Sequence, residues 1–517
     1  MVRVTLIEQA WFARRRPSVY DASVLPSPPE RRIYGNRTLN LRSIRAIGYD
    51  MDYTLVHYRV DEWEQRAYEH TRRRLADRGW QVGDLEFDPS SVIRGLTIDL
   101  ETGNLVKPTR FGWVIRAAHG TRFLEFDDLR STYAGIVVDL SSPRFVFLNT
   151  LFSLSEARLF AQLVDLYDAG RLTGVLGYAD LYRTVRSTID EAHMEGTLKA
   201  EILQDPDTFV VPDPDTVLTL VDQANAGKRL MLITNSEWSY ADRMMRYTVE
   251  PHLPGSWREL FDVVIVAAGK PGFFSGNPPL FRVVDEARGL LEPHHGDLER
   301  GAVYFGGNAA LLEEHLGLAG DQILYVGDHL FDDVHVSKTL LRWRTALVLR
   351  ELESEVRAQR DFAPEEERLR GLMLHKEEME RRLATLRLDK QRIRLGYAPI
   401  AGPPMEPQQR DASIEALRSD LADLDEEIAP LAIAAGQLRN PSWGPLMRSG
   451  NDKSLFARQV ERYADVYTSR VSNFAAETPF AYLRAARGTL PHDPDAAISR
   501  EDARGDTRTA PRPHGAS

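Results

Sequence analysis

The chain reads Arg42-Ser-Ile-Arg-Ala-Ile-Gly-Tyr-Asp-Met-Asp-Tyr-Thr-Leu55, a short apolar run that ends in two acidic residues. Residues 42–49 are typical of a buried strand, and Asp50 and Asp52 follow it directly. Because one residue separates them, both side chains and a backbone carbonyl can reach the same pocket. A carboxylate there can attack phosphorus, and its neighbour can protonate the departing oxygen and later deprotonate a water. An ordinary turn or a helix N-cap would also explain the motif.

Further along the chain, four more apolar runs rich in Val, Ile and Leu alternate with helical stretches such as 308–316. This alternation predicts an α/β fold, a doubly wound parallel sheet with helices on both faces. In such sheets the ligand binds beyond the carboxyl ends of the strands. The four runs are 228–233, 261–267, 302–305 and 322–326. Three of them are followed at this edge of the sheet by residues that could carry chemistry, which are Thr234, Lys270 and Asp328.

Each of these residues also has an explanation without catalysis. Thr234 could cap a helix, Lys270 could be an exposed surface lysine, and the acidic loop at 327–333 could be another cap. In the catalytic interpretation, Thr234 donates its hydroxyl to a phosphoryl oxygen, Lys270 sits on a constrained loop before Pro271, and the acidic loop offers the oxygen ligands that Mg²⁺ prefers. The features occur at successive strand ends in this order, which favours catalysis.

The predicted domain order follows from the spacing of the strands. The segment between the first two strands is too long for a normal crossover, so residues 61–215 should form a cap domain inserted over the site. Two Glu-, Arg- and Leu-rich helices with a Pro-rich turn between them predict a helical hairpin at 350–438, either a solvated arm or an oligomer contact. The remaining segments are an N-terminal segment (1–43), the two parts of the core (44–60 and 216–349), a C-terminal segment packed on the core (439–492) and a disordered tail (493–517).

The composition narrows the classes of function. The 517 residues carry a net charge of -11, which gives no general basic field, so we expect no nucleic-acid partner. The chain has no cysteine, which excludes thiolate nucleophiles and Cys-rich zinc sites and favours the cytoplasm. Residues 1–16 lack the apolar core of a secretion signal, and no run of about 18 apolar residues predicts a membrane span.

The ordered motifs resemble the four motifs of the haloacid dehalogenase (HAD) superfamily. Longer segments narrow the resemblance to the cytosolic purine 5′-nucleotidase family, the IG-type 5′-nucleotidases, over about residues 44–492. The segments are Phe147-Leu-Asn-Thr-Leu-Phe152, Ile233-Thr-Asn-Ser236, Gly269-Lys-Pro271 with Phe273-Phe274, Tyr325-Val-Gly-Asp-His-Leu-Phe331, Phe456-Ala-Arg-Gln-Val-Glu-Arg-Tyr-Ala-Asp-Val-Tyr467, Pro479-Phe480 and Leu490-Pro-His492.

The resemblance implies a role for each motif residue. Asp50 would be the nucleophile and Asp52 the acid/base, with Thr234 and Lys270 as ligands of the phosphoryl group. Mg²⁺ would be held by Asp50, the backbone carbonyl of Asp52 and Asp328. Phosphoryl transfer depends mainly on positioning and charge neutralisation, so a cation and a lysine suit these positions.

Two adjacent acids leave one assignment open. Asp333 takes the position of the last motif acid of the family and would steady either the magnesium ligands or Lys270. Asp332 stands where the resemblance leads us to expect a glycine. The division of labour between Asp332 and Asp333 therefore stays undecided at this point.

Substrate selection should lie in the cap. Residues 178–194 are typical of a helix that presents Arg186, Asp190 and His193 in one direction. The resemblance implies that these side chains and Lys199 contact the nucleotide. A solvated face with an Arg186–Asp190 ion pair would explain the helix without any function. The other implied substrate contacts are Asn149, Asn235 and Ser236.

The resemblance implies a magnesium-dependent phosphoric monoester hydrolase, specifically a 5′-nucleotidase. It would convert purine nucleoside 5′-monophosphates such as IMP or GMP to nucleoside and phosphate through an aspartyl-phosphate, which a nucleoside could also capture in a phosphotransferase reaction. The alternatives are a phosphatase for another small phosphomonoester, such as a sugar phosphate, and an inactive nucleotide-binding scaffold. We expect a cytoplasmic homo-oligomer, a dimer or tetramer, that binds a nucleoside monophosphate and neither nucleic acid nor membrane.

Overall fold

A computed structural model describes residues 27–194, 196–400 and 405–486. The side chains of His193 and Met194 are not among those described. The tail expected at 493–517 lies outside these residues. Within the described ranges, no helix has the length and apolar character needed to cross a membrane.

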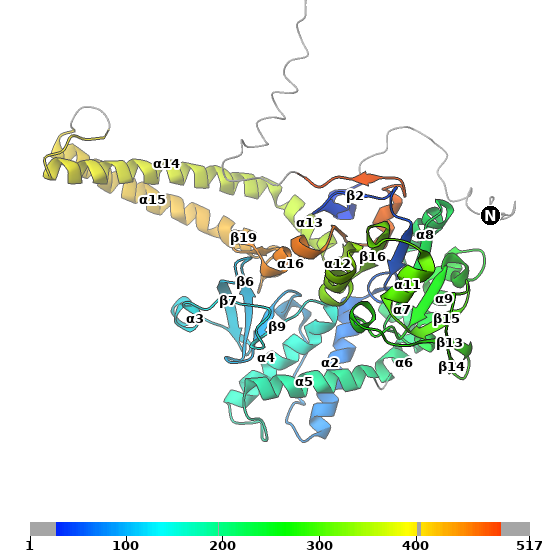
Figure 1. The fold of residues 1–517 in the computed structure, drawn as a ribbon. Helices are drawn as coiled ribbons and strands as arrows, with labels where there is room; N and C mark the ends of the chain where they lie inside the picture. Colours follow the sequence, from blue (N-terminus) through cyan, green and yellow to red (C-terminus); the bar gives the residue numbers. More distant parts are fainter. Residues whose placement is uncertain (1–26, 195, 401–404, 487–517) are drawn as a thin grey trace, which may run out of the picture.

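A sheet of ten strands forms the centre of the molecule (Figure 1). Seven neighbouring strands are parallel, which confirms the predicted α/β class. In spatial order they are β20 (Val466–Thr468), β17 (Arg344–Val348), β16 (Ile323–Gly327), β3 (Ala46–Tyr49), β11 (Arg229–Ile233), β12 (Val263–Val266) and β15 (Val303–Gly306). Antiparallel strands, absent from the prediction, extend both edges. They are β1 (Tyr34–Gly35) beside β20, and β13 (Leu280–Asp285) with β14 (Leu290–Pro293) beside β15.

Helices cover both faces of this sheet because the strands send alternate apolar side chains to opposite faces. In β11, the buried Leu230 and Leu232 belong to one core cluster, and the buried Met231 and Ile233 belong to another. The first cluster includes α8 (Pro214–Asn225) and α9 (Trp238–Val249), and the second includes α10 (Gly272–Ser275), α11 (Ala309–Leu316) and α12 (Val336–Leu341). With both faces apolar, the strand ends are left for polar chemistry.

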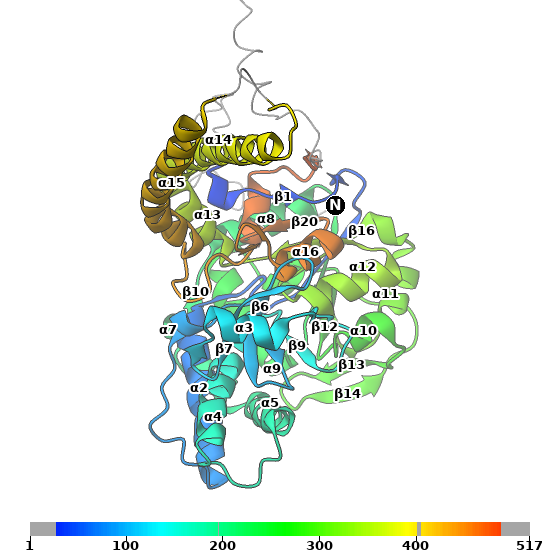
Figure 2. The same cartoon turned by 90° about the vertical axis from the view of Figure 1, so that its left-hand side faces the viewer.

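The chain between β3 and β11 forms a second layer with its own five-stranded antiparallel sheet (Figure 2). The sheet contains β5 (Thr97–Asp99), β6 (Asn104–Pro108), β7 (Val114–His119), β8 (Arg122–Phe123) and β9 (Phe145–Phe147). The helices are α2 (Val60–Asp77), α3 (Phe126–Tyr133), α4 (Leu154–Asp168), α5 (Tyr178–Met194), α6 (Thr197–Gln204) and α7 (Pro206–Phe209). The chain leaves and re-enters the core side by side, because β4 (His57–Tyr58) pairs with β10 (Val210–Val211). The inserted cap is thus tied to the core directly beside the Asp52 segment.

The predicted hairpin extends away from the sheet as two long helices (Figure 1). Helix α13 (Leu352–Asp361) leads into α14 (Ala363–Arg394), and α15 (Pro407–Gly436) returns beside it. Leu383, Ile414 and Leu417 form the small core between the two helices. Helix α15 begins at residue 407, because Pro407 is well suited to the first turn of a helix.

The described part of the C-terminal segment packs on the core and adds the parallel strand β20 to β17. Asp465, which is fully buried, accepts hydrogen bonds from Lys338 at 2.7 Å and Arg344 at 2.9 Å. These contacts fasten the segment to α12 and β17. The remaining elements are α16 (Leu455–Tyr463) and the two-stranded pairs β2 (Leu39–Asn40) with β21 (Tyr482–Leu483) and β18 (Arg448–Ser449) with β19 (Asp452–Lys453).

Candidate active site

The ends of three neighbouring strands bring the first acidic motif and the acidic loop together. Tyr49, the last residue of β3, is level with Val326 on β16 and Leu232 on β11. The next residue, Asp50, donates its backbone N–H to the carbonyl of Val326 at 2.9 Å. Asp328 follows β16 by one residue, so the two acids lie beside each other in space. The prediction that the strand ends converge on one place is correct.

Three carboxylates and one ammonium form the centre of the site. Lys270 Nζ lies 2.9 Å from Asp50 Oδ1 and 2.8 Å from Asp333 Oδ1. Asp50, Asp328 and Asp333 each offer an oxygen, and these oxygens lie within 4.8 Å of one another. Asp328 Oδ2 is buried and has no hydrogen-bond partner among the described residues. A hard divalent cation with oxygen ligands fits this set, because three carboxylates exceed the charge of one lysine.

The pKa values of Asp50, Asp328 and Lys270 are shifted in the directions expected from this excess of negative charge. Burial raises the pKa of Asp50 to about 7; Lys270 opposes the rise, and the carboxylates of Asp333 and Asp52 add to it. Burial, Asp50 and Asp333 raise the pKa of Asp328 well above its usual range. Burial would lower the pKa of Lys270, but Asp333 and Asp50 outweigh it and hold that pKa well above its usual value. A bound cation would favour the ionised carboxylates.

The two adjacent acids left undecided by the sequence have different surroundings. Asp333 is fully buried, contacts Lys270, and accepts the backbone N–H of His329 at 3.1 Å through Oδ2. Asp332 is not one of the clustered carboxylates; it pairs with His329 Nε2 at 3.2 Å and leaves 35% of its side chain exposed. Asp333 therefore belongs to the cluster, in direct reach of the position a cation would take, and Asp332 does not.

Gly327 makes room for Asp333. A Cβ on Gly327 would lie 2.3 Å from Asp333 Oδ2, so any larger residue must displace that carboxylate. Gly327→Ala should therefore lower kcat by about 10²-fold, since a shift of about 1 Å at a catalytic group can cost that much. The measurement is steady-state phosphate release. Gly272→Ala, in open space two residues after Lys270, is the control that should stay near wild type; equal losses in both variants would contradict the explanation.

Asp52 is held apart from the carboxylate cluster by hydroxyl donors. Tyr58 donates to Asp52 Oδ1 at 2.5 Å, and Ser236 donates to Oδ2 at 2.5 Å. Lys199, on α6 of the cap, donates to Ser236 Oγ at 2.9 Å, and the hydroxyl of Tyr240 lies 3.0 Å from that of Tyr58. Because the hydroxyl of Tyr58 is the donor in its hydrogen bond to Asp52, the hydroxyl of Tyr240 must be the donor in the hydrogen bond between the two tyrosines. Lys199 thus reaches Asp52 through Ser236, so two successive hydrogen bonds link the cap to Asp52.

The motif after β11 positions other groups of the site. Thr234 is fully buried, and its Oγ1 accepts the backbone N–H of Ser236 at 3.0 Å. Asn235 uses both ends of its amide on the backbone of Lys270: its Oδ1 accepts from Lys270 N at 2.7 Å and its Nδ2 donates to Lys270 O at 3.1 Å. In this arrangement Asn235 holds the lysine loop, a role different from the substrate contact that the sequence suggested.

The predicted substrate residues of the cap are only partly free to bind a ligand. Arg186 pairs with the buried Glu156 at 3.0 Å and with Asp190 at 3.2 Å. Burial raises the pKa of Asp332, whereas His329, Lys270 and Arg186 lower it. The charge of Arg186, on the cap, therefore acts on an acid of the core. His193 lies on α5, but its side chain is outside the described part.

The side chain of Asn149 has a polar atom that could accept a hydrogen bond from a ligand. Its Oδ1 is buried without a hydrogen-bond partner in the described chain, and its Nδ2 makes a long contact of 3.4 Å to Phe147 O. The neighbouring Phe147 ring lies 5.6 Å from the ring of Phe331, in the acidic loop. Asn149 therefore stands at the junction of cap and core, as a substrate contact would.

Two residues of the site were not found from the sequence. Tyr58 orients Asp52, and Arg94 donates to the backbone carbonyl of Asp328 at 3.2 Å while it pairs with Glu351 at 2.6 Å. Arg94 is buried and lies far from Asp328 in the sequence. Only the position of Tyr58 close behind Asp52 could have suggested its role, and nothing in the sequence around Arg94 points to the site.

Comparison with known proteins agrees with this architecture. A model of the 5′ nucleotidase family matches residues 33–495, nearly the whole chain. The chain belongs to the 5′ nucleotidase family. This membership supports a phosphatase, a hydrolase acting on phosphate esters.

Individual relatives extend over most of the chain. The human 5′-nucleotidase domain-containing protein 2 is 29% identical over 456 residues, which cover 85% of this chain and 81% of that protein. A 5′-nucleotidase domain-containing protein of Dictyostelium discoideum is 26% identical over 487 residues, 92% of this chain and 77% of the relative. Among solved structures, a haloacid dehalogenase-like hydrolase from Streptococcus pneumoniae matches 60% of this chain and 86% of its own, at 12% identity and a TM-score of 0.26. That similarity is too low to support an inference.

Proposed function

We propose that the protein is a magnesium-dependent 5′-nucleotidase that hydrolyses purine nucleoside 5′-monophosphates through an aspartyl-phosphate. The observation that carries the proposal is the separation of two acids one residue apart. Asp50 lies in the cluster with Lys270 and Asp328, whereas Asp52 is held outside it by Tyr58. A nucleophile needs a neighbouring positive charge, and an acid/base needs a different environment from the nucleophile.

In the first step, an Asp50 oxygen attacks phosphorus as the bond from phosphorus to the 5′ oxygen breaks, and Asp52 gives its proton to that oxygen. In the second step, Asp52 takes a proton from water, the water oxygen attacks phosphorus, and the acyl-phosphate bond breaks to restore Asp50. Lys270 and the hydroxyl of Thr234 hold the transferring phosphoryl group. Mg²⁺ held by Asp50, Asp328 and the Asp52 carbonyl, with Asp333 in reach, would neutralise the charge of the phosphoryl oxygens.

Substrate selection falls to the cap. Lys199 already reaches the acid/base through Ser236, and Arg186, which pairs with Asp190, lowers the pKa of Asp332 in the acidic loop by its charge. The unpaired Oδ1 of Asn149 suits a donor on a base or sugar. The choice of a purine rests on the resemblance of the motifs to the cytosolic purine 5′-nucleotidases, and the cytoplasmic location rests on the absence of cysteines.

The test is phosphate release from purified protein over a panel of nucleoside 5′-monophosphates and sugar phosphates. We expect release that requires Mg²⁺ and is at least about tenfold faster with IMP or GMP than with any sugar phosphate. A preference for a sugar phosphate would identify a different phosphatase. Nucleotide binding without turnover on any ester would identify the inactive scaffold. Transfer to an added nucleoside, followed as new monophosphate, would add the phosphotransferase activity.

A further inference from the structure

The helical hairpin has a strong asymmetry of charge along its length. Its half near the core, residues 363–378 and 422–436, carries nine Asp and Glu against three Lys and Arg. Its outer half, residues 379–394 and 407–421, carries eight Lys and Arg against five Asp and Glu. The hairpin is therefore acidic near the core and basic toward its tip. Two such hairpins lying antiparallel would place each basic half on an acidic half.

Only some of the charged residues of the hairpin form ion pairs within it. Arg368 pairs with Glu427 at 2.6 Å, and Lys390 pairs with Asp411 at 2.8 Å, which holds α14 against α15. Nine exposed or half-exposed charged residues of α14 have no ion pair among the described residues. Four of them are Glu377 and Glu378 on the acidic half and Arg392 and Arg394 on the basic half.

Apolar side chains also lie on the outside of α14. Leu374 and Leu388 of this helix, and Leu395 directly after its last residue, are 61%, 37% and 57% exposed. They are separated by multiples of seven residues, which places them along one side of the helix. The inner core of the hairpin is made by other residues, Leu383, Ile414 and Leu417. An exposed leucine stripe of this spacing is typical of a helix that packs against another helix.

We propose that this outer face of α14 binds the same face of a second copy of the chain, antiparallel and about a two-fold axis. The register that pairs Leu374 with Leu395 of the second copy also brings Glu377 opposite Arg392, because each is three residues from its leucine on the side toward the middle of the helix. Glu378 and Arg394 then lie within one turn of that pair. The contact is self-complementary, as a two-fold dimer requires.

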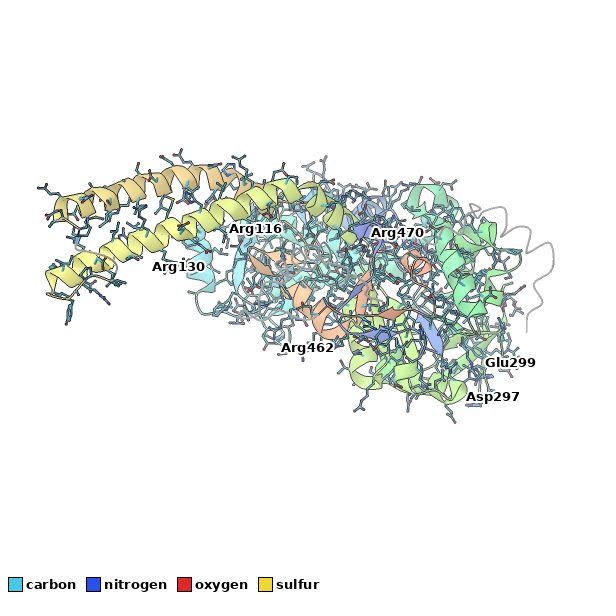
Figure 3. The ribbon with its side chains drawn as sticks, turned by 90° about the horizontal axis from the view of Figure 1, so that it is seen from above. Arg116, Arg130, Asp297, Glu299, Arg462 and Arg470 are labelled. Atoms are coloured by element: carbon cyan, nitrogen blue, oxygen red, sulfur yellow. The ribbon has the colours of Figure 1, made fainter. Side chains whose placement is uncertain are left out.

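The surroundings leave room for such a partner. Seen from above, the outer parts of α14 and α15 extend beyond the rest of the molecule (Figure 3). An acidic surface such as an anionic membrane would attract the outer half and repel the inner half. A second hairpin satisfies both halves at once, and the two Leu374–Leu395 pairs would supply the apolar part of the interface.

The experiment is sedimentation velocity of the full-length protein and of three charge variants at low and high salt. One variant carries Arg392→Glu and Arg394→Glu, a second carries Glu377→Arg and Glu378→Arg, and a third carries all four changes. We expect a wild-type dimer whose Kd rises with salt. Each two-residue variant should dissociate at least about tenfold more readily, because like charges then face each other. The four-residue variant should dimerise again, and an equimolar mixture of the first two should form a heterodimer.

If the four-residue variant and the mixture form dimers again, the two-residue variants are folded, and their weaker dimerisation comes from the lost contact. A wild-type protein that is monomeric at tens of micromolar in low salt would overturn the proposal. So would a dimer whose Kd is the same in all variants. A monomer whose sedimentation with phosphatidylserine vesicles is lost on the Arg392→Glu and Arg394→Glu changes would assign the basic half to a membrane instead.

Discussion

Asp50→Asn should reduce phosphate release on the order of 10⁴-fold or more and should abolish the covalent phosphoenzyme. The amide cannot attack phosphorus, and Asp333 cannot replace Asp50, since Asp333 is engaged by Lys270 and by the backbone of His329. The change preserves the shape of the side chain, so nucleotide binding should persist. The measurements are phosphate release and mass spectrometry of acid-quenched protein during turnover.

Asp332→Asn is the matched control for this prediction. Asp332 is an acid of the same site, but it pairs with His329 and stays partly exposed instead of joining the cluster around Lys270. Its replacement should change kcat by less than about tenfold, and the phosphoenzyme should still form. Release at the wild-type rate by the Asp50→Asn protein would exclude the aspartyl-phosphate mechanism. A large loss in both variants would show that the division between Asp332 and Asp333 is wrong.

Local patterns were enough to predict the centre of the fold. The strands at β3, β11 and β16 appear in the sequence as short runs of Val, Ile and Leu, because a parallel strand is buried on both faces and leaves no polar alternation. The same patterns located Asp50, Thr234 and Asp328 at the strand ends. Periodicity likewise identified α14 and α15 and the helix α5 of the cap.

Contacts between distant segments could not be predicted in this way. β20 has only three residues, and it is recognisable as a strand only once β17 lies beside it. Arg94 reaches Asp328 from the cap, a pairing that depends on the packed arrangement of cap and core. Which of two adjacent acids enters the cluster depends on the local winding of the loop after β16, which composition does not reveal.

Asp52→Asn should slow turnover by about 10²- to 10⁴-fold, the usual contribution of a general acid or base, and should do so unequally for different esters. An alkoxide such as the 5′ oxygen of a nucleoside needs the proton of Asp52 to leave. Nitrophenolate is stable without a proton, so attack on p-nitrophenyl phosphate should stay fast while hydrolysis of the aspartyl-phosphate, which needs a base, becomes slow. The variant should therefore show a burst of nitrophenolate and accumulate phosphoenzyme.

Tyr58→Phe separates the position of Asp52 from its chemistry. This variant keeps the carboxylate but removes the donor at 2.5 Å, leaving Ser236 as the hydroxyl contact to Asp52. A hydrogen bond to a charged group contributes about 1.5–3 kcal/mol, so we expect a loss of about 10- to 100-fold in kcat for nucleotides without accumulation of phosphoenzyme. If Asp52→Asn lowers the rates for nucleotides and for p-nitrophenyl phosphate by the same factor, Asp52 has a structural role and is not the proton donor. A proton donor must matter most for the ester whose leaving group needs the proton.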